Sequence, residues 1–256
     1  MANKPTRPTS LRADVPTDGG SGTKPRLLWL WVGLAAVIVL AAGIAILSSG
    51  DDEELTVGST VPASSGATTG ALDCSNGGPT ADPTSTSAGQ VAEVWPVTVE
   101  GTPLVPMPDG ADPAVGTPAP LLSGFAFDGT PVVVNPCAGP VMLVFLAHWC
   151  PHCNREIPEL LAWRDAGGVP EGLQVIAVTT AVAPDRENYP PSEWIPKMNW
   201  DWPVLADSEA NEAASAFGVS GFPFSVIIGT DGRVLGRSSG ELGQAGIDAF
   251  VADALS

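Results

Sequence analysis

The sequence predicts an α/β domain over residues 91–256, in which helices cover both faces of a mixed sheet. Apolar runs at 141–147 and 173–182 have the length and composition of strands that are buried on both sides. Helical patterns alternate with these strands, and two further strands and a helix end the chain, which is the order expected of an α/β domain.

The first elements of this domain are strands. Residues 94–101, "VWPVTVEG", have strand composition, although Pro and Gly are frequent around them. Residues 124–134 form two short strand patterns, with Asp128-Gly129 as the turn of a hairpin. The run 141–147, "VMLVFLA", then predicts the central strand.

A helix is expected directly after the central strand, with Ile157, Leu160 and Leu161 on its inner face. Further along the chain, 183–203 is long for a connection between strands and contains three tryptophans. Two interpretations stay open for this segment: an extra helix packed by the tryptophans, or a loop that selects partners.

The remaining elements complete the sheet and its cover. Ser208 is the expected cap of a helix that stops at Gly218. The other expected elements are a short strand at 202–207, strands at 224–229 and 233–240 around the turn Thr230-Asp231-Gly232-Arg233, and a last helix at 244–254.

An unbroken apolar run of 21 residues, 27–47, precedes this domain. A helix of that length spans roughly 30 Å, the hydrocarbon thickness of a bilayer. Basic residues precede the run and Asp51 to Glu54 follow it, so we expect a transmembrane helix with residues 1–26 in the cytoplasm. The alternative is a cleaved signal peptide, whose apolar core is usually shorter.

The exported part is acidic and begins with a flexible linker. Residues 48–90 are rich in Ser, Thr, Gly, Ala and Pro, a composition that cannot bury enough apolar surface to fold. Residues 1–50 carry five basic and two acidic side chains, whereas the rest of the chain carries a net charge of −20, which gives −17 overall. We therefore expect no nucleic-acid partner.

The segment "AHWCPHC" carries the chemistry, and it contains both histidines of the chain. Cys150 lies where the central strand ends and a helix begins, with Pro151 at the first helical position. The helix dipole and first-turn amides stabilise a thiolate there, and a thiolate is the nucleophile of disulfide exchange. Cys153 lies one turn away and can close a disulfide, while His152 between them can favour the thiolate further.

Other uses of a Cys-x-x-C pair fit less well. A haem tether needs His after the second cysteine, where this chain has Asn154. A zinc or copper site lacks further ligands, because Cys74 and Cys137 do not form a clustered pair. A peroxidatic cysteine would need Pro and Ser or Thr where Leu143 and Ala147 stand. A purely structural bridge would close too short a loop to stabilise the fold much.

The segment "VMLVFLAHWCPHCNREIPEL" resembles the active-site region of thioredoxin-fold proteins, more narrowly the membrane-tethered TlpA/ResA-type thiol–disulfide oxidoreductases. The pattern W-C-x-x-C-x-x-E-x-P is matched by Trp149, Cys150, Cys153, Glu156 and Pro158. "VGTPAPLLSGFAFDGTPVVV" and "GVSGFPFSVIIGTDGRVLGRSSG" extend the resemblance over roughly residues 115–256.

The resemblance implies a role for each matched residue, and it implies no cofactor and no metal. Cys150 would be the exposed attacking thiol, Cys153 the buried resolving thiol, and Glu156 an acid near that thiol. Pro223 would be a cis-proline facing the disulfide, with the backbone of Phe222 binding a substrate strand. The alternatives are an ordinary strand-entry proline and a solvated first-turn glutamate.

Two departures from the family leave the direction of electron flow open. Thioredoxin has a buried Asp in the central strand where this chain has Val144. The Pro151-His152 dipeptide is that of DsbA-type oxidants, whereas the scaffold resembles that of reductases. A stabilised Cys150 thiolate would make the disulfide a stronger oxidant.

The sequence also supports expectations for Cys74, Cys137 and His148. A Cys74–Cys137 disulfide is favoured for an oxidising compartment, and free cysteines or pairing between chains are the alternatives. His148 is expected to be an exposed polar residue without a special role, or else a rim residue of the site.

The function predicted from the sequence is an extracytoplasmic, membrane-anchored enzyme. It would exchange the Cys150–Cys153 pair with the cysteines of exported proteins, and a second redox partner would recycle it. The alternative is a metal-binding chaperone or assembly factor that uses the same pair without redox turnover.

Overall fold

The structure, a computed structural model, describes Leu72, Cys74 and residues 90–256. The predicted cytoplasmic tail (1–26), transmembrane helix (27–47) and nearly all of the linker (48–90) lie outside the described residues. Within the described part, no helix has the length and apolar character needed to cross a membrane.

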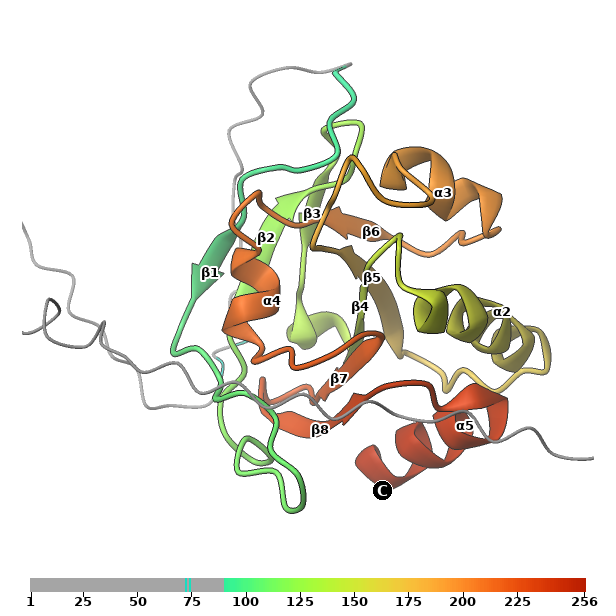
Figure 1. Cartoon of the computed structure of the whole chain (residues 1–256). Helices are drawn as coiled ribbons and strands as arrows, with labels where there is room; N and C mark the ends of the chain where they lie inside the picture. The colour runs from blue at the N-terminus through green and yellow to red at the C-terminus, as the bar shows by residue number, and fades with distance from the viewer. Residues whose placement is uncertain (1–71, 73, 75–89) are drawn as a thin grey trace, which may run out of the picture. The chain divides into compact units, whose positions relative to one another are not determined.

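The described residues 90–256 form one mixed sheet with helices on both faces (Figure 1). The strand order is β1-β2-β6-β5-β4-β7-β8, and β3 pairs with β2. The strands are β1 Thr98–Glu100, β2 Leu121–Phe125, β3 Pro131–Val133, β4 Val141–Leu146, β5 Gln174–Thr179, β6 Val204–Ala206, β7 Phe224–Ile228 and β8 Val234–Ser239. The helices are the 3-10 helix η1 Pro136–Ala138 and the α-helices α2 Pro151–Asp165, α3 Pro191–Lys197, α4 Glu212–Ala216 and α5 Gly243–Ala254.

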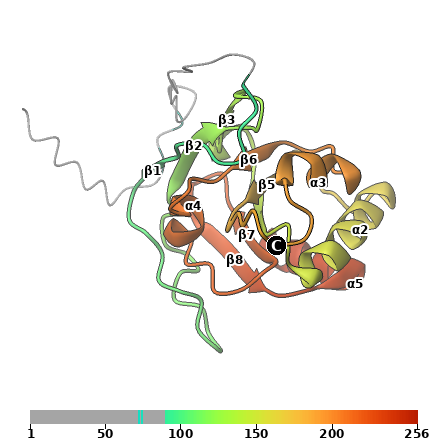
Figure 2. The same ribbon diagram turned by 45° about the horizontal axis from the view of Figure 1, so that its top comes forward.

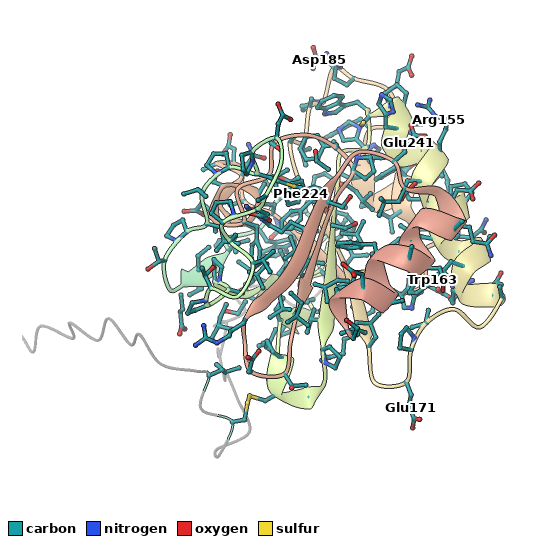
Figure 3. All side chains as sticks on the ribbon, turned by 90° about the horizontal axis from the view of Figure 1, so that it is seen from below. Arg155, Trp163, Glu171, Asp185, Phe224 and Glu241 are labelled. Carbon is teal, nitrogen blue, oxygen red and sulfur yellow. A yellow bond between two sulfur atoms is a disulfide. The ribbon has the colours of Figure 1, made fainter. Side chains whose placement is uncertain are left out.

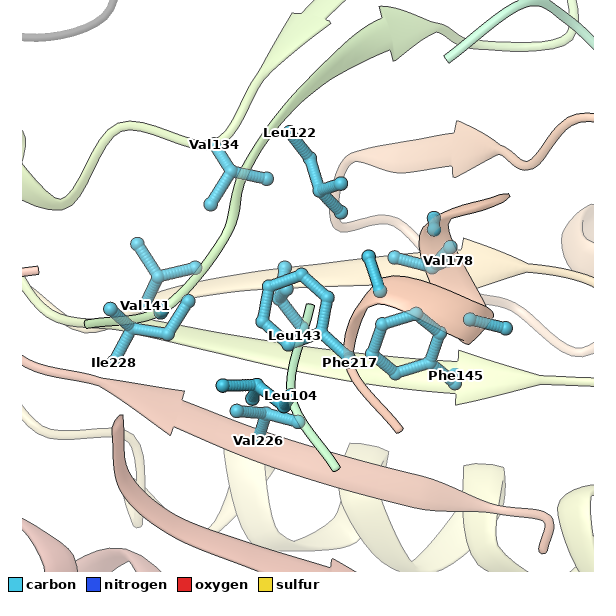
Figure 4. Packing of buried hydrophobic residues seen from close by; sticks show 14 of the residues in the cluster. Leu104, Leu122, Val134, Val141, Leu143, Phe145, Val178, Phe217, Val226 and Ile228 are labelled. Carbon is cyan, nitrogen blue, oxygen red and sulfur yellow. The ribbon is translucent and has the colours of Figure 1, made fainter. Parts of the chain in front are cut away.

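The predicted central strand lies at the middle of the sheet. β4 is parallel to β5 and antiparallel to β7, and all six of its residues are buried. Its side chains alternate between two hydrophobic cores: Leu143 and Phe145 enter one (Figure 4), while Met142 and Val144 enter the other. This explains why the strand appears in the sequence as a continuous apolar run.

The two cores are covered by different helices (Figure 2). α4 covers the core that contains Phe145, where the Phe217 ring lies 5.6 Å from the Phe145 ring. α2, α3 and α5 cover the other core, with Trp163 and Ile247 buried between α2 and α5 and the sheet. The predicted arrangement of helices on both faces is confirmed.

The hairpins and the last helix lie close to their predicted positions. β2 and β3 pair across Asp128 and Gly129, and Gly129 adopts a φ of 80°, a conformation that glycine accepts without strain. β7 and β8 form the terminal antiparallel hairpin, and α5 follows it. The first strand, β1, is shorter than predicted because only Thr98–Glu100 pair with β2.

The segment 183–203 contains the extra helix α3. Trp194 and Trp200 are buried against the body of the domain, and Trp202 packs on Trp200 with ring centroids 5.0 Å apart. The interpretation in which the tryptophans pack an additional helix is therefore confirmed.

The helix predicted after Ser208 begins later than expected. Asp207 is fully buried, and its carboxylate accepts hydrogen bonds from the backbone N–H groups of Ser208, Ala213 and Ala214. Ser208 contributes through its hydroxyl oxygen, which accepts from the N–H of Glu212. The first turn is thus organised around Asp207, with Ser208 as a secondary partner.

Candidate active site

Cys150 occupies the junction between β4 and α2 that the sequence predicts. It is the N-cap of α2 in an extended conformation, Pro151 follows at the first helical position, and the side chain is only 6% exposed. The Cys150 thiol is free, and its Sγ lies 3.6 Å from the backbone oxygen of Phe222. A sulfur at this place lies at the positive end of the α2 dipole.

Cys153 is free and completely buried in the first turns of α2. Burial raises the pKa of this thiol far above its ordinary value, and the nearby charges of Cys150 and Glu156 act in the same direction. The expectation that Cys150 is exposed is wrong: it is buried like Cys153, because the segment that carries Phe222 lies against its sulfur. Cys153 stays protonated beneath it.

The Phe222–Pro223 peptide is cis, and it faces Cys150 through the Phe222 carbonyl. Pro223 stands directly before β7, so the segment that carries Phe222 connects α4 to the strand that pairs with β4. The structure thus brings Cys150, Phe222 and Pro223 together, although 72 residues separate Cys150 from Phe222.

Trp149 is fixed beside Cys150 by three neighbours. Its Nε1 donates to the Ala181 carbonyl at 2.8 Å, the Phe222 ring meets it edge-on with centroids 6.1 Å apart, and the Arg186 guanidinium lies 4.7 Å from its ring centroid. The loop after β5 therefore forms one wall of the site.

His152 is exposed and belongs to a charged cluster with Arg155 and Glu241. The Glu241 carboxylate pairs with the His152 Nδ1 and with the Arg155 guanidinium, and Arg155 Nη2 lies 2.9 Å from His152 Nδ1. Hydrogen bonding to Arg155 and His152 holds the pKa of Glu241 below its usual range. Neither Arg155 nor Glu241 was singled out from the sequence.

Glu156 is buried on the inner side of α2 and is not the solvated surface residue of the alternative interpretation. Its carboxylate accepts hydrogen bonds from the N–H groups of Leu242 at 3.1 Å and Gly243 at 3.0 Å. Burial raises the pKa of this carboxyl, and the two backbone hydrogen bonds oppose that effect. Glu156 therefore joins the buried thiol region to the loop before α5.

The prediction that His148 is exposed is wrong. The residue is 1% exposed; its Nδ1 lies 2.7 Å from the Glu187 carbonyl, and its Nε2 accepts from the Ala183 N–H at 3.1 Å. These partners assign the proton to Nδ1 and use both ring nitrogens on the loop after β5. The sequence pattern failed because the loop that covers His148 lies more than 30 residues further along the chain.

Asn154 is a structural centre of the site that the sequence did not indicate. Its Nδ2 donates to the Cys150 carbonyl at 2.9 Å and the His148 carbonyl at 3.3 Å, and its Oδ1 accepts from Trp194 Nε1 at 2.9 Å. One amide therefore connects the redox motif, the segment before it and α3.

Cys74 and Cys137 form a disulfide. Cys137 lies in η1 before β4, whereas Cys150 follows β4, so the disulfide and the Cys150 thiol lie at opposite ends of that strand. Figure 3 shows the disulfide at the bottom of the domain, away from Arg155 and Glu241. This disulfide is thus separate from the redox pair.

The site offers little to a metal ion. In residues 90–256, together with Leu72 and Cys74, no group of three or more His, Cys, Asp or Glu side chains is arranged to hold one. His148 uses both nitrogens on backbone groups, and His152 pairs with Glu241.

Fold and site together define a thioredoxin-fold domain with a dithiol at the start of α2 and a cis-proline opposite. Comparison with known families agrees: residues 115–236 match the sequence model of the AhpC/TSA family. The match covers the broad thioredoxin-fold class and does not distinguish the TlpA/ResA type.

One curated relative is a probable nucleoredoxin 1 from Arabidopsis thaliana, 28% identical over 126 residues. The alignment covers 48% of this chain and 21% of the relative, so the chain spans about a fifth of that protein.

Two solved structures are similar to this chain over about half of its length. A thiol:disulfide interchange protein from Chlorobium tepidum is 26% identical, with a TM-score of 0.45, and the match covers 57% of this chain and all of that one. A secreted disulfide oxidoreductase of Mycobacterium tuberculosis is 21% identical, with a TM-score of 0.42 and coverage of 51% and 93%.

Proposed function

We propose that the protein is a thiol–disulfide oxidoreductase that exchanges the Cys150–Cys153 pair with cysteines of other proteins. The observation that carries this proposal is the position of Cys150, at the N-terminus of α2 and 3.6 Å from the carbonyl before the cis-proline. A thiol at a helix start with a buried second thiol one turn away has the two parts that disulfide exchange requires.

In the reducing direction, the Cys150 thiolate attacks one sulfur of a substrate disulfide. The substrate S–S bond breaks, the leaving sulfur takes a proton, and a mixed disulfide joins Cys150 to the substrate. Cys153 then loses its proton and attacks Cys150 Sγ, which releases the second substrate thiol. Two electrons pass to the substrate, and the protein is left with a Cys150–Cys153 disulfide; the oxidising direction is the reverse.

The burial of Cys153 determines that Cys150 reacts first and Cys153 second. Because its pKa is raised, Cys153 does not compete as a nucleophile in the first step. It must be deprotonated for the second step, and the buried Glu156 is the acidic group that influences its charge. We assign Glu156 the role of tuning this proton transfer.

The compartment and anchor form part of the same proposal. Residues 27–47 would anchor the chain in the membrane with residues 1–26 inside, and the domain would act on exported proteins as a TlpA/ResA-type enzyme. The Cys74–Cys137 disulfide and the acidic exported part support an oxidising, extracytoplasmic location. A second redox protein would restore the Cys150–Cys153 pair after each turnover.

Trapping of the mixed disulfide tests the proposal. Full-length Cys153→Ser, incubated with a disulfide-bonded model protein, should form a covalent adduct, because the thiol that would resolve the mixed disulfide is missing. Dithiothreitol should reduce this adduct and release the model protein. Cys150→Ser is the matched control and should form no adduct. The wild-type chain should exchange with glutathione; failure to exchange, or an adduct that persists in Cys150→Ser, would contradict the proposed function.

A further inference from the structure

The loop between β8 and α5 brings a carboxylate to the redox motif. Glu241 from this loop meets His152 and Arg155 at the start of α2, and Figure 3 shows Arg155 and Glu241 side by side. Arg155 contacts both Glu241 carboxylate oxygens, with Nε 3.2 Å from Oε2. One oxygen, Oε1, serves His152 and Arg155 together.

We propose that Glu241 is a positioning residue that sets the reduction potential of the Cys150–Cys153 pair. Its carboxylate holds His152 and Arg155 and offsets the positive charge of Arg155, so that the disulfide is a weaker oxidant than the Cys-Pro-His-Cys motif alone would make it. This inference rests on the proposed function and adds a regulator of the same site.

The position of Glu241 is built into the fold. The backbone of the next residues is fixed to α2, because Leu242 and Gly243 donate to the buried Glu156 carboxylate and Gln244 donates to Glu159 at 3.1 Å. The carboxylate therefore approaches His152 from an anchored loop. This distinguishes the cluster from an ordinary surface ion pair between two mobile side chains.

The contacts of the Cys150 sulfur leave His152 aside. In the described part of the chain, Cys150 Sγ donates to the Phe222 carbonyl and interacts with Cys153 beneath it. The His152 Nδ1 instead faces Glu241 and Arg155, and one nitrogen cannot both donate to the first and accept from the second. The Nδ1 side of the ring therefore faces the ion pair of Glu241 and Arg155.

The charge balance gives the sign. The thiolate form of the reduced pair carries negative charge on Cys150, whereas the disulfide carries none, so a nearby cation favours the reduced form and a nearby anion disfavours it. Arg155 lies within electrostatic range of Cys150, and Arg186, stacked on Trp149, is a further cation at the site. Glu241 is the anion of the cluster, so its removal should make the disulfide more oxidising.

The test measures the equilibrium of the full-length chain with glutathione in three variants. Glu241→Gln keeps a hydrogen-bonding side chain. It should shift the equilibrium toward the reduced protein by about three- to tenfold, which is the size expected when one charge interacts with the thiolate across mostly water. That shift corresponds to about 14 to 30 mV. Arg155→Gln should shift it in the opposite direction, and the double variant should return to within about twofold of wild type.

A structural effect would have a different pattern, because loss of either partner would disturb the loop in the same direction. High salt should reduce the shifts of both single variants. Glu193→Gln is the matched control: Glu193 pairs with Lys197 on α3, away from the cluster, and its loss should leave the equilibrium unchanged.

The outcomes separate the two proposals. If wild type equilibrates reversibly with glutathione but both variants match it, or if both shift in one direction, the role of Glu241 is refuted while the proposed function stands. If wild type shows no reversible couple, the proposed function fails and this inference fails with it.

Discussion

Replacing Asn154 with Ala should destabilise the domain by about 2–4 kcal/mol, mainly by leaving one buried donor without a partner. Trp194 is 2% exposed, and its Nε1 donates to the Asn154 Oδ1 at 2.9 Å. An unsatisfied buried donor costs about 1–3 kcal/mol. The carbonyls of Cys150 and His148 lose the Asn154 amide but keep other partners, so each adds at most about 1 kcal/mol.

A double-mutant cycle isolates the buried donor. The free energy of unfolding is measured by urea denaturation for wild type, Asn154→Ala, Trp194→Phe and the double variant, all with reduced cysteines. Phenylalanine has no N–H, so Asn154→Ala should be milder in the Trp194→Phe background by at least about 1 kcal/mol. Equal effects in both backgrounds would show that the Trp194 bond contributes nothing and that the reasoning from burial is wrong.

Three further predictions concern the disulfide, the buried acid and the tryptophan of the motif. Cys137→Ser should lower the free energy of unfolding by up to about 4 kcal/mol, because the Cys74–Cys137 disulfide closes a loop with a sequence separation of 63. The midpoint of thermal unfolding, measured with and without the substitution, checks this. Glu156 has a raised pKa in the fold, so its stabilising contribution is complete below the unfolded pKa and is lost as pH rises through the folded pKa. Between about pH 4 and neutral pH, the free energy of unfolding of Glu156→Gln should therefore rise relative to that of wild type. A difference between the two proteins that does not change with pH would refute this prediction. Trp149 abuts Cys150, so reduction should change the fluorescence of wild type reversibly, and Trp149→Phe should lose most of that change.

Much of the fold follows from patterns within single segments. The apolar run of β4, the Asp128-Gly129 turn and the terminal hairpin each carry a local signal that the structure reproduces. Boundaries are less predictable where tertiary contacts decide them. Helix α4 begins at Glu212 because the buried Asp207 accepts from the N–H groups of its first turn, and the burial of Asp207 depends on the whole sheet.

The site divides in the same way. Cys150, Cys153 and Pro223 stand in motifs that are visible in one stretch of sequence, and the structure brings them together. Glu241 and Asn154 carry no such signal, because Glu241 meets Arg155 from 86 residues away and the bond of Asn154 to Trp194 spans 40 residues. Sequence periodicity describes the neighbours of a residue on its own element, and it is silent about the loop that will cover it.

The two histidines of the chain show how contacts that the sequence does not reveal change the interpretation of the mechanism. From the sequence, His152 is the residue that would strengthen the oxidant, and His148 is a bystander at the surface. In the fold, His148 is buried and fixes the loop after β5, whose Ala181 carbonyl holds Trp149 beside Cys150. His152 remains at the surface, where its Nδ1 pairs with Glu241 from the loop before α5. With Glu241 setting the reduction potential as we propose, the oxidising strength of the motif depends on a residue 89 positions further along the chain, and the Pro151-His152 dipeptide alone is a poor guide to it.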